Sequence, residues 1–148
     1  MRVLVLHGPN LNLLGSRQPE IYGTTTLAEI DRQLAARGAE LEVAVHAVQS
    51  NSEGGLIDAI QGAQGTEDGL VINPAAYSHT SLAVRDALLA VRLPAVEVHL
   101  SNPAAREEFR HLDLAAGACL GVVAGFGPRG YLIALEQLVL HLRSELPG

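Results

Sequence analysis

The sequence predicts an α/β fold, in which one domain contains a five-stranded parallel sheet with helices on both faces. Short β-branched runs alternate with helical patterns along the chain, and this alternation is typical of βαβ units. The length of 148 residues fits a single domain, residues 1–148, and no linker or internal repeat divides it. The hydrophobic share of 48% is large enough to form a buried core.

The predicted strands are short apolar runs at residues 3–6, 41–48, 69–72, 95–100 and 119–123. Helical patterns occupy residues 27–37, 55–64, 80–92, 103–110 and 130–146. Gly38 follows the first helix as an expected C-cap, and Pro94 prevents the third helix from continuing. Five strands in so short a chain favour a flavodoxin-like doubly wound sheet over a full dinucleotide-binding domain.

A long loop, residues 8–24, joins the first strand to the first helix and shows neither helical nor strand periodicity. Loops of this length in compact domains are usually either functional or disordered. Several leucine and isoleucine side chains provide apolar anchors, which argues against disorder. The loop also carries Asn10, Arg17 and Tyr22, which together could bind an anion and move a proton. We interpret this segment, the lid loop, as half of an active site that becomes ordered when ligand binds.

Charge and composition exclude several classes of protein. The formal net charge is −6 and the pI is near 5.4, which disfavours a surface for nucleic acid or for an anionic membrane. The ten positively charged side chains are all arginines, so Schiff-base catalysis and Walker-type phosphate binding, which need a lysine, are excluded. No apolar run is long enough to span a membrane, and the start of the chain does not resemble a signal peptide. We therefore expect a cytoplasmic protein without a membrane partner.

Polar side chains follow four of the predicted strands where each one ends. They are Asn10, residues 49–51 (Gln-Ser-Asn), Asn73, and the group His99, Ser101 and Asn102. In doubly wound sheets, ligands bind beyond the carboxyl ends of the strands. Asparagine and serine also favour turns, which is the structural alternative, although it explains one or two strand ends better than four.

The segment AVEVHLS, residues 95–101, predicts an acid–base pair. Alternate residues of a strand share a face, so Glu97 and His99 lie together with Ser101, opposite the apolar residues. A carboxylate beside a histidine orients the imidazole and raises its basicity, so His99 could serve as a general acid. A purely structural Glu–His pair is the alternative.

The segment NPAAYSHTS, residues 73–81, contains another group of polar residues between the third strand and the third helix. Ser78 and Thr80 are expected N-caps, whereas Asn73 and His79 could anchor a substrate carboxylate or hydroxyl. In the lid loop, Arg17 could favour the phenolate form of Tyr22, which would make a phenol into a usable base. The alternative is a packing tyrosine beside a solvated arginine.

Metal and nucleotide sites find little support. The sequence has no HExxH, no paired cysteine motif and no tight His/Asp cluster, and no GxGxxG follows the first strand. The single cysteine, Cys119, lies in an apolar run and is expected to be a buried thiol. We expect neither a metal nor a cofactor.

Eight segments together resemble the type II 3-dehydroquinate dehydratases over nearly the whole chain. They are GPNLNLLG (8–15), Tyr22-Gly23, QSNSEG (49–54), INPAAYSHTS (72–81), RDAL (85–88), VEVHLSN (96–102), REEFR (106–110) and Gly130-Tyr131. The resemblance implies a flavodoxin-like, cofactor-independent lyase that eliminates water from 3-dehydroquinate to give 3-dehydroshikimate in the shikimate pathway. It also implies a homo-oligomer in which trimers assemble into a dodecamer.

The resemblance implies a role for each matching residue. Tyr22, activated by Arg17, would remove a proton beside the ketone, and Asn10 would stabilise the enolate. His99, held by Glu97, would protonate the departing hydroxyl. The substrate-binding residues would be Asn73, Ser101 and the Leu100 backbone for the carboxylate, and His79 and Arg110 for ring hydroxyls, with Asp86 reaching in from a neighbouring subunit.

Two positions depart from the family pattern. Arg17-Gln18-Pro19 replaces a common Arg-Glu-Pro, so closure of the lid loop could differ. Residues 111–113 read His-Leu-Asp where many relatives read His-His-Ser, a change expected to affect subunit contacts more than chemistry. Two other functions are kept open: a non-catalytic flavin or nucleotide carrier, which would be coloured or nucleotide-loaded as purified, and an assembly subunit without activity.

Overall fold

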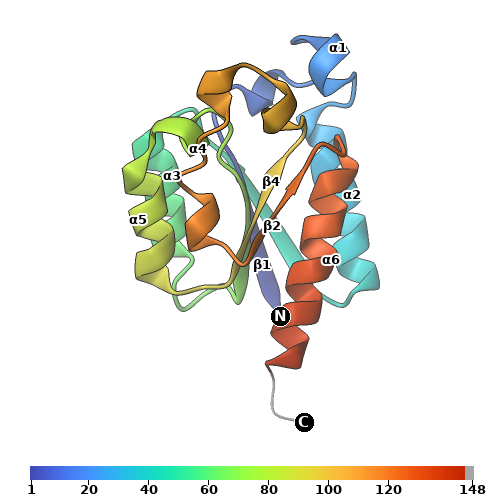
Figure 1. The fold of residues 1–148 in the computed structure, drawn as a ribbon. Helices are drawn as coiled ribbons and strands as arrows, with labels where there is room; N and C mark the ends of the chain where they lie inside the picture. The colour runs from blue at the N-terminus through green and yellow to red at the C-terminus, as the bar shows by residue number, and fades with distance from the viewer. Residues whose placement is uncertain (146–148) are drawn as a thin grey trace.

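The computed structural model describes residues 1–145, which form one five-stranded sheet between two layers of helices (Figure 1). The strands are β1 (Arg2–His7), β2 (Ala44–Gln49), β3 (Gly69–Asn73), β4 (Ala95–His99) and β5 (Gly121–Ala124). The α-helices are α1 (Pro19–Tyr22), α2 (Leu27–Glu40), α3 (Glu53–Gly62), α4 (Tyr77–Thr80), α5 (Leu82–Val91) and α6 (Arg129–Ser144). Four 3-10 helices are η1 (Leu11–Leu13), η2 (Pro103–Ala105), η3 (Glu108–Arg110) and η4 (Ala116–Ala118).

All the strand pairs are parallel, and the strands lie in the order β2-β1-β3-β4-β5. The chain therefore moves to one side of β1 and then to the other, which defines a doubly wound sheet. This order confirms the predicted flavodoxin-like fold.

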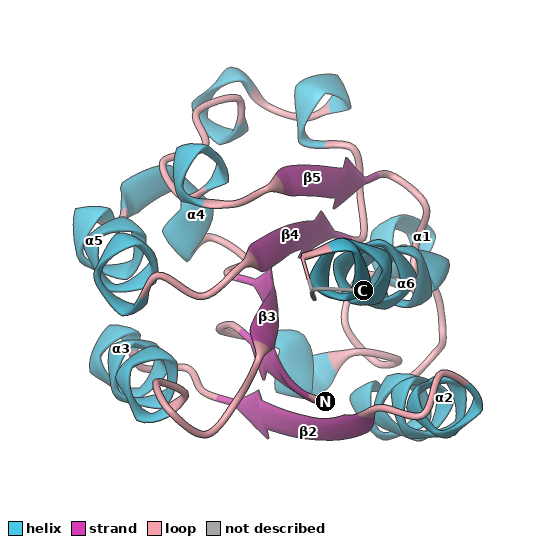
Figure 2. Cartoon of the chain, turned by 90° about the horizontal axis from the view of Figure 1, so that it is seen from below, coloured by secondary structure: helices cyan, strands magenta, loops and turns pink. Residues whose placement is uncertain are grey.

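Each face of the sheet has its own apolar core, because alternate residues of a buried strand point to opposite sides. Val3 and Val5 of β1 belong to the core beneath α2 and α6. Leu4 and Leu6 belong to the core beneath α3 and α5. Figure 2 shows α2 and α6 on one side of the sheet and α3 and α5 on the other. The apolar face of β4 packs against the α6 side, as the alternation in residues 95–101 predicted.

Three predicted local features differ in the structure. Residues 103–110 form the two short turns η2 and η3 instead of one helix, because Arg106 between them has an extended backbone. Gly38 lies inside α2 rather than at its C-cap. A Cβ atom at Gly38 would lie 2.5 Å from a Val45 side-chain atom, so the absence of a side chain lets α2 pack against β2. Ser81, and not Ser78 or Thr80, caps α5 by accepting a hydrogen bond from the Val84 amide.

The lid loop contains two short helical segments, η1 and α1, where no periodicity was expected. It begins at Gly8, whose amide donates a 2.7 Å hydrogen bond to the Asn73 carbonyl. A Cβ atom at Gly8 would lie 2.6 Å from the Pro74 carbonyl oxygen, so only glycine lets β1 leave the sheet this close to β3. Within residues 1–145, no helix has the length and apolar character needed to cross a membrane.

Candidate active site

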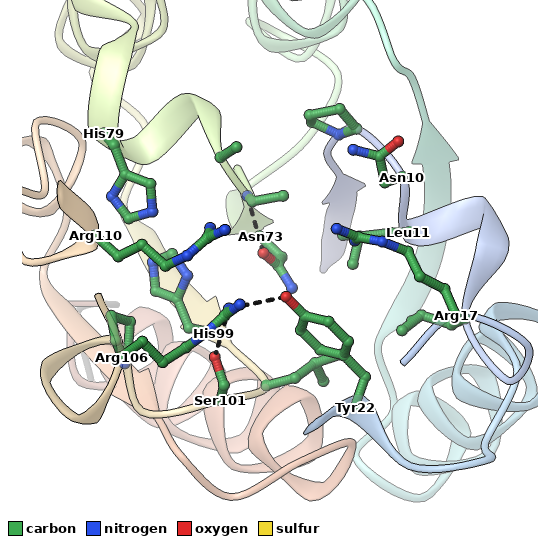
Figure 3. A pocket seen from close by; sticks show the side chains of 16 residues that line it. Asn10, Leu11, Arg17, Tyr22, Asn73, His79, His99, Ser101, Arg106 and Arg110 are labelled. Atoms are coloured by element: carbon green, nitrogen blue, oxygen red, sulfur yellow. Dashed lines mark hydrogen bonds between the residues drawn. The ribbon is translucent and has the colours of Figure 1, made fainter. Parts of the chain in front are cut away.

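A pocket opens at the carboxyl edge of the sheet, between the lid loop and the segments that follow β3 and β4 (Figure 3). Its empty volume, with the open mouth included, is about 690 Å³. Nine of its sixteen lining residues carry polar or aromatic side chains: Asn10, Arg17, Tyr22, Asn73, His79, His99, Ser101, Arg106 and Arg110. The pocket therefore brings together polar residues from segments far apart in the sequence.

Two arginines contact Tyr22, which lies at the end of α1. Arg17 and Arg106 each place their guanidinium carbon 5.5 Å from the centre of the Tyr22 ring. Only Arg106 reaches the hydroxyl: its Nη1 donates a 2.8 Å hydrogen bond to the phenolic oxygen and a longer one, 3.4 Å, to Ser101 Oγ. Figure 3 shows Arg106 between the two oxygens. The pairing of Tyr22 with Arg17 is thus a contact with the ring face, while Arg106 supplies the charge at the oxygen.

His99 and Glu97 form the predicted pair on one face of β4. His99 Nε2 lies 2.6 Å from Glu97 Oε1, and the Glu97 side chain is fully buried. Burial raises the pKa of the Glu97 carboxyl to about 7. Burial also opposes protonation of His99, but the carboxylates of Asp113 and Glu97 outweigh it and raise the pKa of the imidazole to about 9. His99 is therefore protonated near neutral pH, and its Nδ1 is the ring nitrogen left for a ligand.

Asp113 is the third member of this cluster. Its Oδ2 lies 3.6 Å from His99 Nε2, and ligand-type atoms of Glu97, His99 and Asp113 all lie within 4.8 Å of one another. The sequence shows no tight His/Asp cluster, but the fold brings together Glu97, His99 and Asp113, which lie up to sixteen positions apart. The change at residues 111–113 thus places a carboxylate beside the candidate acid, while its effect on subunit contacts stays a prediction.

Asn10 is held at the rim of the pocket by the segment that follows β2. Its backbone is left-handed, with φ of 69°, and its amide donates a 2.9 Å hydrogen bond to Asn51 Oδ1. Gln49 Nε2 donates to the same oxygen at 3.1 Å and to the Gly8 carbonyl at 3.2 Å. This network orients the start of the lid loop through its main chain and leaves the Asn10 side chain facing the pocket (Figure 3).

The segment after β3 presents two polar groups of defined direction. Asn73 Oδ1 accepts a 3.0 Å hydrogen bond from the Ala75 amide, so its side-chain NH₂ is the group available as a donor. His79 Nδ1 lies 2.7 Å from the Leu112 carbonyl oxygen, which can only accept. His79 must therefore carry a proton on Nδ1, and in the neutral ring Nε2 is an acceptor for a ligand hydroxyl.

The remaining predicted residues divide into two groups. Leu100, Ser101 and Arg110 line the pocket, and Arg110 is held from behind by a salt bridge to Glu107. Asp86 does not line it: this residue is exposed on α5, so within one chain the structure does not bring it to the site.

Arg106 and Asp113 are the two site residues that the sequence reasoning missed. Arg106 was noted only within the REEFR motif, and the predicted helix over 103–110 gave no reason to separate it from its neighbours. The break between η2 and η3 aims it at Tyr22. Asp113 follows a segment without periodicity, so no sequence pattern linked it to β4.

Comparisons with known proteins find similar sequences and a similar fold. The protein-family model described as dehydroquinase class II matches residues 1–139. A 3-dehydroquinate dehydratase of Ruegeria pomeroyi is 55% identical over 143 residues, covering 97% of this chain and 96% of the relative. One of Synechocystis is 56% identical over 144 residues, covering 97% and 95%. The crystal structure of a type II dehydroquinase from Propionibacterium acnes matches with a TM-score of 0.91 and 45% identity, covering 94% of this chain and 96% of that one.

Proposed function

Because the chain belongs to the class II dehydroquinase family, we propose that it removes water from 3-dehydroquinate to give 3-dehydroshikimate in the shikimate pathway. The observation that carries the proposal is the pairing of a tyrosine hydroxyl, bound by an arginine, with a protonated histidine across one pocket. Elimination beside a ketone needs one base, one acid and a group that stabilises an enolate, and the pocket contains all three.

Tyr22 is the proposed base. As a phenolate it takes the proton from the carbon beside the ketone, and the electron pair of that C–H bond forms the enolate. Arg106 donates a hydrogen bond to the phenolic oxygen and Arg17 lies against the ring, so two positive charges stabilise the negative oxygen. Asn10, a neutral donor at the pocket rim, stabilises the enolate oxygen.

His99 is the proposed acid. The enolate re-forms the ketone and expels the hydroxyl, which takes the Nδ1 proton of the imidazolium and leaves as water. Glu97 keeps the ring oriented through Nε2. The proton gained by Tyr22 must then return to His99 through solvent before the next turnover, so the enzyme needs no cofactor or metal in this scheme.

The other polar side chains are proposed to bind substrate. Asn73 NH₂, Ser101 Oγ and the Leu100 backbone would hold the carboxylate, while His79 Nε2 and Arg110 would hold ring hydroxyls. Asp86 would act in the pocket of a neighbouring copy, within a cytoplasmic dodecamer built from trimers. Mixing Tyr22→Phe and Asp86→Ala chains tests this sharing. Hybrid assemblies should regain activity only if each site takes its Tyr22 from one chain and its Asp86 from a neighbouring chain.

The proposal is tested by measuring 3-dehydroshikimate formation from 3-dehydroquinate with no other addition. Activity should survive borohydride, since the chain has no lysine to form a Schiff base, and it should survive a chelator, since the proposed scheme uses no metal. Tyr22→Phe should abolish turnover while leaving substrate binding, and His99→Ala should also remove nearly all turnover. Full activity of Tyr22→Phe would contradict the assignment of the base, and absence of product with the unmodified protein would contradict the function.

A further inference from the structure

We infer that Asp113 is a second positioning carboxylate for His99, which holds a proton on the imidazole in concert with Glu97 and so sets the pH range in which the acid is loaded. The inference rests on the proposed role of His99 as general acid. It assigns Asp113 no contact with substrate, because this residue does not line the pocket.

The geometry places both carboxylates at the same ring nitrogen. Glu97 Oε1 lies 2.6 Å and Asp113 Oδ2 lies 3.6 Å from His99 Nε2. The Nε2–H group of His99 thus faces both carboxylates, and the imidazolium is the single positive charge between them. A cationic imidazole is therefore strongly preferred over a neutral one, since the neutral ring would leave two carboxylates close together without a counter-charge.

The main chain holds Asp113 in this place. Its Oδ1 accepts hydrogen bonds from the Ala115 and Ala116 amides, at 3.1 and 3.0 Å, at the start of η4. These bonds fix one carboxylate oxygen and aim the other at His99. The side chain is partly buried, so water screens the pair less than it would screen a surface ion pair.

The Glu97 carboxyl provides a second indication that this site favours a charged imidazole. Its Oε2 is buried and has no hydrogen-bond partner among residues 1–145. An ionised carboxylate oxygen with no donor is costly in a buried site. A positive charge on His99, 2.6 Å from the other Glu97 oxygen, reduces that cost. The lowered pKa of Asp113 agrees with an ionised carboxylate beside the charged ring.

Other titratable groups near His99 do not account for this preference. Cys119, which precedes β5, has a pKa raised by burial to about 12 and is neutral over the working range. His99 lines the same pocket as five other charged or titratable side chains: Arg17, Tyr22, His79, Arg106 and Arg110. The three arginines oppose protonation of His99, so the carboxylates of Glu97 and Asp113 must supply the attraction.

The test compares Asp113→Asn with the unmodified protein by NMR of ¹⁵N-labelled histidine rings, with His99 identified by the signal lost in His99→Gln. Asparagine keeps an oxygen for the Ala115 and Ala116 amides and removes only the charge. Asp113→Ser, whose hydroxyl accepts the same bonds, serves if the asparagine variant does not fold. Asp58→Asn, an exposed position on α3, removes the same charge elsewhere and is the matched control.

We expect Asp113→Asn to lower the proton affinity of His99 at least tenfold, about one pKa unit, with no change in Asp58→Asn. The alkaline limb of the kcat–pH profile should move to lower pH by the same amount, while KM stays constant. A His99 midpoint that agrees in Asp113→Asn and the unmodified protein within roughly 0.3 pH unit would overturn the inference. The NMR result does not depend on turnover, so a protein inactive on 3-dehydroquinate would refute the proposed function and leave this measurement decisive.

Discussion

Replacing Arg106 with glutamine is expected to slow the dehydration of 3-dehydroquinate far more than the same replacement of an arginine outside the pocket. Arg106 Nη1 lies 2.8 Å from the Tyr22 oxygen, so the guanidinium stabilises the phenolate directly. A hydrogen bond to a charged group contributes about 1.5–3 kcal/mol. Two unit charges about 4 Å apart attract by about 4 kcal/mol at the effective dielectric constant of a protein surface. A loss of about 2–4 kcal/mol corresponds to a fall in kcat of roughly 30- to 900-fold.

The assay is initial-rate dehydration over a range of pH, with Arg32→Gln as the matched control. Arg32 is exposed on α2, so its replacement changes the net charge equally without touching the site. The deficit of Arg106→Gln should shrink as the pH rises, because hydroxide then removes the phenolic proton without help from a positive charge. A kcat for Arg106→Gln within about threefold of the control at neutral pH would refute the role of Arg106, since roughly 0.7 kcal/mol is less than one charged hydrogen bond contributes.

Three further predictions concern stability and reactivity. Gly8→Ala should lower the free energy of unfolding by about 1–3 kcal/mol, because the added Cβ atom would meet the Pro74 carbonyl. Gly62→Ala is the control, since a Cβ atom there has nothing within 4 Å, and its free energy of unfolding should not fall. Urea denaturation measures both variants. His99 and Glu97 both bind protons more tightly when folded, so their contribution to stability should fall as pH rises through about 7 for Glu97 and about 9 for His99. A urea midpoint that rises from pH 6 to pH 9 would contradict this sign. Cys119 is half-buried rather than fully buried as expected, and burial raises its pKa to about 12. It should react with a maleimide at neutral pH far more slowly in the folded protein than in urea, and equal rates would contradict the raised pKa.

The fold could be predicted from the sequence because the strongest pattern, alternation of apolar strands and amphipathic helices, is also what determines the sheet. All five strands occur near their predicted positions, and strand β4 shows the predicted division of faces. Gly38 and residues 103–110 were misjudged for one common reason. Both predictions used local preference without the tertiary contacts, which are the approach of β2 to Gly38 of α2 and the hydrogen bond of Arg106 to Tyr22.

The candidate site divides in the same way. His99 and Glu97 could be paired from the sequence, because two residues apart on one strand is a fixed geometry. The partnership of Arg106 with Tyr22 spans 84 positions, and that of Asp113 with His99 depends on how an irregular segment returns to β4. No periodicity relates residues across such distances, so only the folded chain brings them together. The same limit applies to Asp86, whose proposed site lies in another copy.

The division of labour between Tyr22 and His99 is tested most directly by exchange of substrate hydrogen with D₂O. With His99→Gln, the enolate forms but its hydroxyl cannot leave, so 3-dehydroquinate should gain deuterium at the carbon beside the ketone without dehydration. With Tyr22→Phe, neither deuterium uptake nor product should appear, and mass spectrometry of the recovered substrate measures both. Deuterium uptake by Tyr22→Phe above the uncatalysed rate would contradict the account, because another group would then be the base.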